Sequence, residues 1–514
     1  MSMDREFLEA TGIEQPEAWP AIALVTHRSG EWRREVTGRA NLELNVPANG
    51  HSRFHVASIA KQFTGLLTAL FIARGKLRLT DEIGSLLDWL PESCAGIRLH
   101  HLLFHTSGLR DQWPLAYFSG LAPGDVIDTA SVRRWAARSG ELNFRPGTRH
   151  LYCNTGYTLL ALALERVSGL GFGALLRQEV LDPLGMQDTE IVEAARQLIE
   201  NRVQGYEHRD GTWSIQDPPY AVIGSTCMRT CAADMQTWLG ADLDSAMFRE
   251  ARDGGFFTPG YLDDGTPLRY GFGLIHDQMG GQHVIMHGGY DFGFNAALLR
   301  SLDSDTGVFA CGAGSYVRLE QEAVRLFRGM VSSSGPASAS APAAEQGTAR
   351  LRAGTYANAD CSDVRRVETQ PDGSQKLLWM QGFAIRPSAS VAEEFDLVGS
   401  AAKLRQPASD QLMIANGDDV MRLDLVETGP AGHPTLTGAY YSEELRSVLV
   451  IEADGRSVSI QFGNNPPESL HVASDRLMQW SSYWGVLETS DDGTVSSVLV
   501  SHPRCLNVRF DRIE

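Results

Sequence analysis

The sequence predicts a multidomain protein, in which a domain of mixed helices and sheet is followed by two small antiparallel β-barrels. Three observations support this prediction. The chain has 514 residues, which is too long for one ordinary hydrophobic core. A stretch rich in Ser, Ala and Pro, without periodicity, occupies residues 332–348 and is typical of a linker. Before it the apolar residues follow long helical patterns, and after it they follow short alternating ones.

Residues 1–331 alternate between segments typical of strands and segments typical of helices. The expected strands are 21–25, 284–286, 296–299 and 307–313. The expected helices are 59–74, 132–138, 155–167, 172–180 and 232–239. This mixture predicts a sheet with helices packed on it.

The region after the linker is rich in short alternating segments separated by turns such as Pro371-Asp372-Gly373. The expected strands include 376–380, 411–414, 447–451, 457–462, 495–500 and 506–510. This pattern is typical of antiparallel β modules. The triplets Gly354-Thr355-Tyr356 and Gly438-Ala439-Tyr440 give a weak internal repeat. We therefore expect one barrel at 349–430 and a second at 431–514.

Composition and charge exclude several classes of protein. Hydrophobic residues make up 43% of the chain and charged residues 21%, which is typical of a globular protein. No apolar run reaches the roughly 18 residues that a membrane span needs. The net charge of −18 argues against nucleic acid or an anionic membrane as a partner.

Cysteine usage and the N-terminal sequence predict a cytoplasmic protein. The seven cysteines are scattered and have no zinc-site spacing, so we expect reduced thiols. The first residues lack a basic segment followed by an apolar one, so we expect no signal peptide. No metal or cofactor is expected.

The tetrapeptide Ser58-Ile59-Ala60-Lys61 opens a long apolar segment that should form a buried helix. Residues three apart share a helix face, so Ser58 and Lys61 can meet. A serine hydroxyl becomes a good nucleophile when a neighbouring base takes its proton, and a lysine held neutral can be that base. Taken alone, the pattern also fits a capping serine beside a surface lysine.

Two further segments carry candidate site residues. In the first, Tyr152 and Asn154 alternate and should face one side of an extended piece. A phenol can relay a proton, and an amide can hold both the lysine and a substrate carbonyl. In the second, an apolar strand carries His287, Gly289 and Tyr290. The glycine allows close approach of a substrate backbone, and the Tyr290 N–H can pair with that of Ser58 as an oxyanion hole.

Together these motifs resemble those of the penicillin-recognising serine hydrolases, namely the serine β-lactamases, DD-peptidases and their esterase and aminopeptidase relatives. The shared signature is Ser-x-x-Lys, then Tyr-x-Asn, then His-x-Gly. Other segments are similar to the class C branch: His105-Thr106-Ser107-Gly108-Leu109, Pro146-Gly147-Thr148, Pro183-Leu184-Gly185-Met186 and Tyr270-Gly271-Phe272-Gly273. The resemblance implies an antiparallel sheet flanked by helices, with a helical subdomain.

A catalytic domain followed by two β-barrels is most similar to the bacterial D-aminopeptidases. That resemblance implies that a loop of the last barrel takes part in recognising the substrate amine. The matching stretch is 463–475, in which Glu468 or Asp475 could meet an ammonium group. The chain departs from its relatives at Thr226-Cys227 and Thr230-Cys231, where they usually have Gly-Gly and Ser-Thr. We expect Cys153 to point away from the site.

We therefore predict that Ser58 attacks the carbonyl of a small D-residue or glycine, with Lys61 and Tyr152 accepting the proton. Asn154, His287 and Gly289 would position the substrate, and no metal takes part. The alternatives are a β-lactamase-like carboxylesterase, a DD-peptidase, or a sensor that binds a lactam or peptide without turnover. The expected partner is a small peptide or amide, with a homodimer as the candidate assembly.

Overall fold

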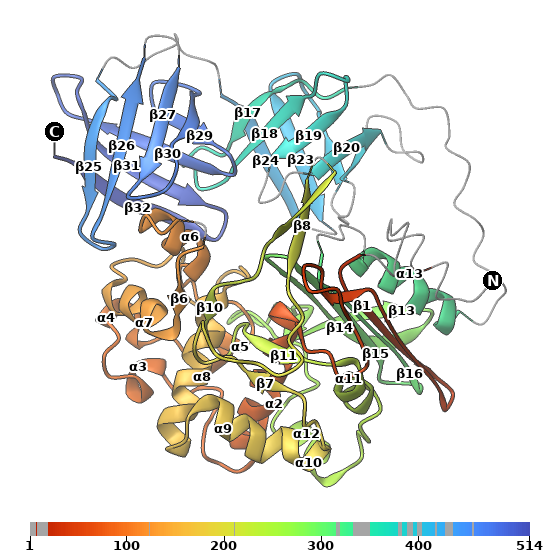
Figure 1. The fold of residues 1–514 in the computed structure, drawn as a ribbon. Helices are drawn as coiled ribbons and strands as arrows, with labels where there is room; N and C mark the ends of the chain where they lie inside the picture. Colours follow the sequence, from red (N-terminus) through yellow and green to blue (C-terminus); the bar gives the residue numbers. More distant parts are fainter. Residues whose placement is uncertain are drawn as a thin grey trace. The chain divides into compact units, whose positions relative to one another are not determined.

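The computed structural model describes residues 7, 19–122, 124–209, 211–314, 319–332, 350–378, 383–387, 394–397, 403–416, 419–426, 435–454 and 457–513. The chain divides into two compact units, each coloured along the sequence in Figure 1. One unit comprises Met1–Leu109 and Gly124–Ala337, and the other comprises Arg110–Pro123 and Ser338–Glu514. The expected linker lies outside the described residues, apart from Ser332.

The first unit is built on one seven-stranded sheet in which every neighbouring pair is antiparallel. Its order is β12-β13-β14-β15-β16-β1-β2. The strands are β1 (Ile22–Arg28), β2 (Glu31–Thr37), β12 (Tyr270–Gly271), β13 (Leu274–Met279), β14 (Gln282–Asp291), β15 (Phe294–Ser301) and β16 (Thr306–Gly312). All four expected strands of this domain fall on it.

Helices cover both faces of this sheet, because alternate residues of its strands point to opposite sides. Ile22 and Leu24 pack with α13 (Leu319–Val331) in one cluster. Ala23 and Val25 belong to the larger cluster on the other face, which contains α2 (Ala60–Ala73), α8 (Asn154–Ser168) and α11 (Ala232–Leu239). The predicted sheet with packed helices is confirmed.

Helix α2 lies at the centre of the larger cluster. A single 3-10 turn, Ala57–Ile59, leads directly into it, so the helical stretch runs from 57 to 73 where 59–74 was expected. Two glycines allow close packing against it. A Cβ on Gly65 would meet the Phe272 carbonyl oxygen at 1.9 Å, and a Cβ on Gly273 would meet that of Lys61 at 2.3 Å. Any side chain at either place would push the helix away from the segment before β13.

The expected helix at 172–180 is instead α9 (Phe172–Leu176) followed by a π turn, Arg177–Leu181. The remaining helices of this unit are α3 (Ile83–Leu86), α4 (Glu92–Ala95), α5 (Leu99–Leu103), α7 (Thr129–Arg138), α10 (Asp182–Leu184) and α12 (Ala246–Asp253). Its short strands are β3 (Arg39–Asn41), β4 (Val46–Pro47), β5 (Phe54–His55), β6 (Ile127–Asp128), β7 (Glu190–Ile191), β8 (Tyr206–Arg209), β9 (Thr212–Ile215), β10 (Tyr220–Ala221) and β11 (Met228–Thr230).

The second unit contains two closed antiparallel barrels, as predicted. The first has strands β17 (Gly354–Ala357), β18 (Val364–Thr369), β19 (Gln375–Leu378), β20 (Phe383–Pro387), β21 (Glu394–Leu397), β22 (Lys403–Arg405), β23 (Gln411–Asn416) and β24 (Asp419–Leu425). The second has strands β25 (Gly438–Ser442), β26 (Ser447–Ala453), β27 (Val458–Phe462), β28 (Glu468–Val472), β29 (Leu477–Trp480), β30 (Tyr483–Thr489), β31 (Val495–His502) and β32 (Cys505–Arg512).

The Gly-x-Tyr repeat corresponds to the first strand of each barrel. Both tyrosine side chains are buried. The Tyr356 hydroxyl donates to the Arg352 carbonyl and the Tyr440 hydroxyl to the Leu436 carbonyl, each at 2.7 Å. Each hydroxyl donates to the carbonyl four residues before it in the chain. The repeat therefore reflects the same hydrogen bond formed once in each barrel.

Residues 110–123, expected within the first domain, pack with the barrels in the second unit. They include α6 (Gln112–Phe118). The buried Arg110 guanidinium donates to both carboxylate oxygens of Glu444 at 2.6 Å and to the Leu506 carbonyl at 3.0 Å. The Tyr117 ring stacks on Tyr483 with centroids 4.4 Å apart. The paired, buried Arg110 and the stacked Tyr117 hold this segment in the second unit. Nothing in the local sequence indicated that the segment would belong there.

Within the described ranges, no single helix is long and apolar enough to cross a membrane, although α8 and residues 172–184 meet the length and composition test as a pair bent by 78°.

Candidate active site

Ser58 lies on the turn between β5 and α2. The preceding Ala57 has φ 47, a left-handed conformation that is uncommon for alanine and costs free energy. Ser58 itself is half-buried, so its hydroxyl stays reachable, whereas Lys61 is completely buried. The Lys61 Nζ lies 3.0 Å from the Ser58 Oγ. The structure thus brings together the hydroxyl and the amine that the spacing predicted would meet.

Two further oxygens surround the Lys61 Nζ. The Asn154 Oδ1 lies 2.8 Å away and the Ser225 carbonyl oxygen 2.6 Å away. An ammonium group can donate to all three oxygens, including the Ser58 Oγ. A neutral amine can donate to Asn154 and Ser225, and its lone pair then accepts the Ser58 proton. Asn154 was predicted from its motif, whereas Ser225 was not.

Ser225 contacts Lys61 through its backbone carbonyl. Because every residue has this group, the residue type at 225 could not identify it as part of the site. The turn that presents it has left-handed residues on either side, Gly224 with φ 79 and Cys227 with φ 61. Glycine would adopt this conformation without strain, whereas a cysteine adopts it at a cost in free energy. The buried Cys227 thiol accepts the Val222 N–H at 3.2 Å, which helps to close the turn.

Tyr152 lies beside the same amine. The Lys61 Nζ is 5.0 Å from the centroid of the Tyr152 ring, and the phenol oxygen is attached directly to that ring. Cys153 is extended, with φ −140 and ψ 114, as expected for alternation of Tyr152 and Asn154. Its buried thiol donates to the Leu109 carbonyl at 3.4 Å, so it points into the core as predicted.

His287 is buried, and both of its ring nitrogens are engaged. The Nδ1 lies 2.6 Å from the Gly288 carbonyl oxygen, which can only accept, so Nδ1 carries the hydrogen. The Nε2 then accepts from the Tyr270 hydroxyl at 3.1 Å. Burial, and secondly the charge of Lys61, lower the pKa of His287 to about 3. Burial also raises the pKa of Tyr270, which keeps its donor hydrogen. His287 is therefore neutral at physiological pH.

Gly289 lies against the segment that leads to Ser58. A Cβ at this position would lie 2.4 Å from the Val56 carbonyl oxygen, so only glycine lets β14 approach so closely. Tyr290 follows on β14 opposite Asn295, and its side chain is 63% exposed. The proximity of β14 to the Ser58 turn is the arrangement that an oxyanion hole needs. The role of the Tyr290 N–H stays a prediction.

The predicted amine-recognition stretch belongs to the second unit. Its description as a loop is wrong for residues 468–472, which form strand β28 of the second barrel. The antiparallel pairing of Glu468 with Ile460 and of Leu470 with Val458, both on β27, makes this part a regular strand. The Glu468 carboxylate accepts a short hydrogen bond from the Tyr117 hydroxyl in that unit. Asp475 lies in the turn after β28.

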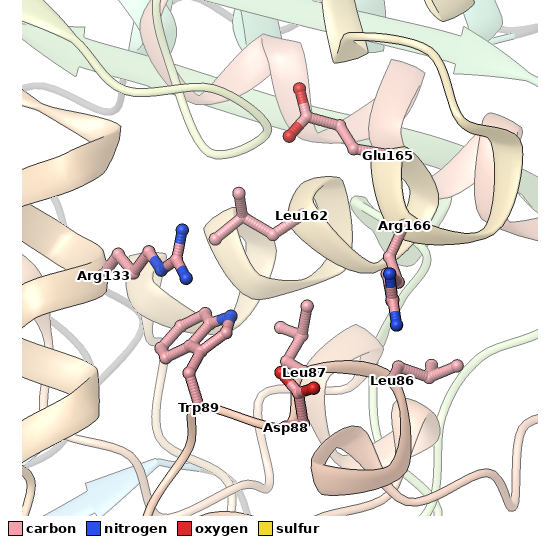
Figure 2. Close-up of a pocket in the computed structure, with 8 residues that line it drawn as sticks. All are labelled: Leu86, Leu87, Asp88, Trp89, Arg133, Leu162, Glu165 and Arg166. Carbon is pink, nitrogen blue, oxygen red and sulfur yellow. The ribbon is translucent and has the colours of Figure 1, made fainter.

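A surface pocket of the first unit lies away from these residues in the sequence. Figure 2 shows the side chains that line it, which are Leu86, Leu87, Asp88, Trp89, Arg133, Leu162, Glu165 and Arg166. The Arg133 guanidinium lies over the Trp89 ring, 4.9 Å from its centroid. The Glu165 carboxylate accepts the Phe172 N–H at 2.8 Å. The lining includes none of Ser58, Lys61, Tyr152, Asn154 or His287, so this pocket is separate from the residues described above.

Two side-chain groups in the described ranges are close enough together to hold a metal ion. In the group of His51, Asp188 and Cys231, the Arg53 guanidinium donates to Asp188 at 2.9 Å and competes with a cation. In the group of His100, His101 and Asp263, the His101 Nδ1 accepts the Arg98 N–H at 3.1 Å. Its Nε2 must then carry the hydrogen and cannot ligate. Neither donor set suits a metal.

Comparison with known proteins agrees with this geometry. The Beta-lactamase family model matches residues 13–321. A D-aminopeptidase of Gluconobacter oxydans is 28% identical over 484 residues, covering 87% of this chain and 85% of that protein. One of Cereibacter sphaeroides is 26% identical over 457 residues, covering 84% and 82%. The octameric penicillin-binding protein homologue of Pyrococcus abyssi superposes with a TM-score of 0.54 at 16% identity, covering 89% of this chain and 96% of that one.

Proposed function

The chain belongs to the Beta-lactamase family, and from this premise we propose that it is a D-aminopeptidase-like serine hydrolase working through an acyl-enzyme. Its substrates would be peptides, amides or esters whose N-terminal residue is a small D-amino acid or glycine. The relatives named D-aminopeptidase, which match most of the chain, support this choice within the family. The observation that carries it is the contact of 3.0 Å between the Lys61 Nζ and the Ser58 Oγ in a buried site.

Lys61 is the proton acceptor in this proposal. In its neutral form its two N–H bonds point to the Asn154 Oδ1 and the Ser225 carbonyl, at 2.8 and 2.6 Å. The lone pair is then directed at the Ser58 hydroxyl. Asn154 and the Ser225 carbonyl thereby orient the base, and Tyr152 beside it completes the path for the proton.

The reaction then proceeds in two halves. The Ser58 Oγ bonds to the carbonyl carbon of the N-terminal residue while its proton moves to Lys61. The carbon–nitrogen bond breaks, and the proton passes through Tyr152 to the departing amine. A water molecule next attacks the ester on Ser58, giving the free amino acid and restoring the hydroxyl. The N–H groups of Ser58 and Tyr290 would stabilise the oxyanion in both halves.

Neutral His287 supports an aminopeptidase over a β-lactamase or a DD-peptidase. β-Lactams of the penicillin type and C-terminal peptides carry a carboxylate, which a positive charge at the third motif would bind. The buried His287 offers no such charge, because its pKa is about 3 and both nitrogens are engaged within the protein. The neutral ring is compatible with a substrate that carries a free amine instead.

The test is a comparison of three substrates with wild-type protein and the Ser58→Ala variant. D-alanyl-p-nitroanilide, a short-chain p-nitrophenyl ester and a chromogenic cephalosporin are offered side by side. We expect turnover to be fastest with the first, and to fall by several orders of magnitude in Ser58→Ala with an unchanged circular dichroism spectrum. Residual activity within tenfold of wild type would refute the nucleophile.

The alternative functions would give different results in the same experiment. Preferred cleavage of the ester indicates a carboxylesterase, and preferred cleavage of the cephalosporin indicates a β-lactamase. A lactam sensor forms an acyl-enzyme that mass spectrometry still detects after hours. Recognition of the substrate amine by Glu468 or Asp475, a homodimeric assembly and a cytoplasmic location are further parts of the proposal. The last is supported by the seven cysteines, none of which forms a disulfide in the structure and six of which are buried.

A further inference from the structure

We propose that His105 is a positioning residue that holds Tyr152 in place. It supplies the hydrogen-bond acceptors that a neighbouring strand would otherwise supply. This inference rests on the proposed hydrolysis, in which Tyr152 carries the proton. It concerns a residue outside the three motifs that supply the chemistry. The argument comes from backbone hydrogen bonds, ring contacts and an unusual backbone conformation.

The segment that carries Tyr152 is extended but belongs to none of the described sheets. Buried backbone N–H groups need acceptors, which an adjacent strand would ordinarily supply. Here one residue supplies two of them. The Leu151 N–H donates to the His105 carbonyl at 2.8 Å, and the Cys153 N–H donates to the His105 Nδ1 at 3.1 Å. Tyr152 is therefore fixed on both sides by bonds to His105.

The backbone of His105 is left-handed, with φ 58. Such a conformation is uncommon outside glycine, and asparagine, aspartate and histidine adopt it more readily than other residues. It persists where surrounding contacts hold it, and it gathers at functional sites. In this conformation the carbonyl and the imidazole of one residue serve alternate positions of the same extended segment.

The His105 ring also contacts the functional aromatic side chains directly. It is 1% exposed, and its centroid lies 4.2 Å from that of Tyr152 and 4.5 Å from that of Tyr270. Tyr270 is the donor that fixes His287. His105 thus packs against Tyr152, which carries the proton in the proposed reaction, and against Tyr270, which orients His287. A displacement of about 1 Å of such a group can cost about a hundredfold in rate.

A matched pair of substitutions separates the hydrogen bond from the fold. Both His105→Asn and His105→Gly tolerate φ 58, but only asparagine can place an acceptor oxygen where the Nδ1 accepts the Cys153 N–H. The readouts are the labelling rate of Ser58 by a fluorophosphonate probe, kcat and KM for D-alanyl-p-nitroanilide, and the thermal midpoint. We expect His105→Gly to lower the labelling rate and kcat by about a hundredfold with KM within threefold. His105→Asn should keep at least a third of both.

A double substitution with Tyr152→Phe tests whether His105 acts through Tyr152. If it does, His105→Gly lowers the labelling rate by less than threefold in the Tyr152→Phe background, because the group it positions is already gone. An equal loss in both backgrounds overturns the proposal, as does a folded His105→Asn variant that is as slow as His105→Gly. If His105→Gly does not fold, His105→Asn alone tests the proposal. The proposal stands if this variant keeps at least a third of the labelling rate and of kcat, and fails if it does not.

The labelling rate keeps this test separate from the proposed function. It requires an activated Ser58 and no particular peptide. A wild-type chain that is labelled rapidly but hydrolyses none of the three substrates loses the aminopeptidase assignment, while the comparison of His105 variants still stands. A wild-type chain that is not labelled at all overturns both.

Discussion

The neutral state of His287 makes a quantitative prediction about stability in acid. Its pKa in the folded protein is about 3, below its ordinary value of 6.5. As the pH falls below 6.5 the unfolded chain therefore binds a proton at this position that the folded chain refuses. The free energy of unfolding decreases by about 1.4 kcal/mol per pH unit for one such group. Between pH 7.5 and 4.5, His287 alone should cost about 3 kcal/mol of stability.

The matched variant is His287→Gln. Its amide oxygen can accept the Tyr270 hydroxyl in place of the Nε2, and it has no proton to gain. Urea unfolding is followed by ellipticity at 222 nm, because α6 is the one described helix assigned to the barrel unit and the signal reports on the first unit. The wild type should lose about 3 kcal/mol more than the variant between pH 7.5 and 4.5. The contributions of the other histidines cancel in this difference.

The result also shows whether His287 binds a proton in the folded protein. Equal losses in the two proteins, within about 0.5 kcal/mol, would mean that His287 takes up its proton in the folded state. The tautomer inferred from its contacts with Gly288 and Tyr270 would then be wrong. The argument that the third motif presents no positive charge would fail with it.

Two further predictions concern stability. Gly289→Ala should destabilise the first unit by about 1–3 kcal/mol, because the new methyl group meets the Val56 carbonyl at 2.4 Å. The Ser58 labelling rate should fall with it. Gly329→Ala on α13, which has open space around it, is the control and should leave urea midpoints unchanged or raise them. Tyr117→Phe should cost the second unit about 1–3 kcal/mol in urea unfolding followed by tryptophan fluorescence, since it leaves the Glu468 carboxylate and the Trp480 Nε1–H without their hydroxyl partner. A loss below about 0.5 kcal/mol would contradict that account.

The parts of the fold that the sequence predicts are those governed by local pattern. The long apolar helix after Ser58, the strand at 284–286 and the alternating segments of both barrels follow from periodicity alone. Short helices such as α3 and α4 have four residues each and leave no periodic signal. The place of residues 110–123 depends on Glu444 and Tyr483, more than 300 positions away, which no local pattern can show.

The same division holds for the site. Ser58, Lys61, Tyr152 and Asn154 were found because their chemistry lies in their side chains and their spacing is recognisable. Ser225 contributes a backbone carbonyl, whose position depends on the left-handed Cys227 beyond it. His105 contributes through one carbonyl and one ring nitrogen to a segment 46 positions away at Leu151. Such roles depend on geometry, so the structure was needed to find them.

Lys61 and His287 are two basic side chains in one buried site, and the fold prepares only Lys61 to hold a positive charge. Three oxygens surround the Lys61 Nζ within 3.0 Å, so an ammonium there is solvated by the protein. His287 has one carbonyl and one hydroxyl, which a single neutral tautomer satisfies completely. The charge of Lys61 in turn lowers the pKa of His287 further. The positive charge that forms when Lys61 accepts the Ser58 proton therefore lies beside the nucleophile, and not at the third motif, where it would anchor a carboxylate.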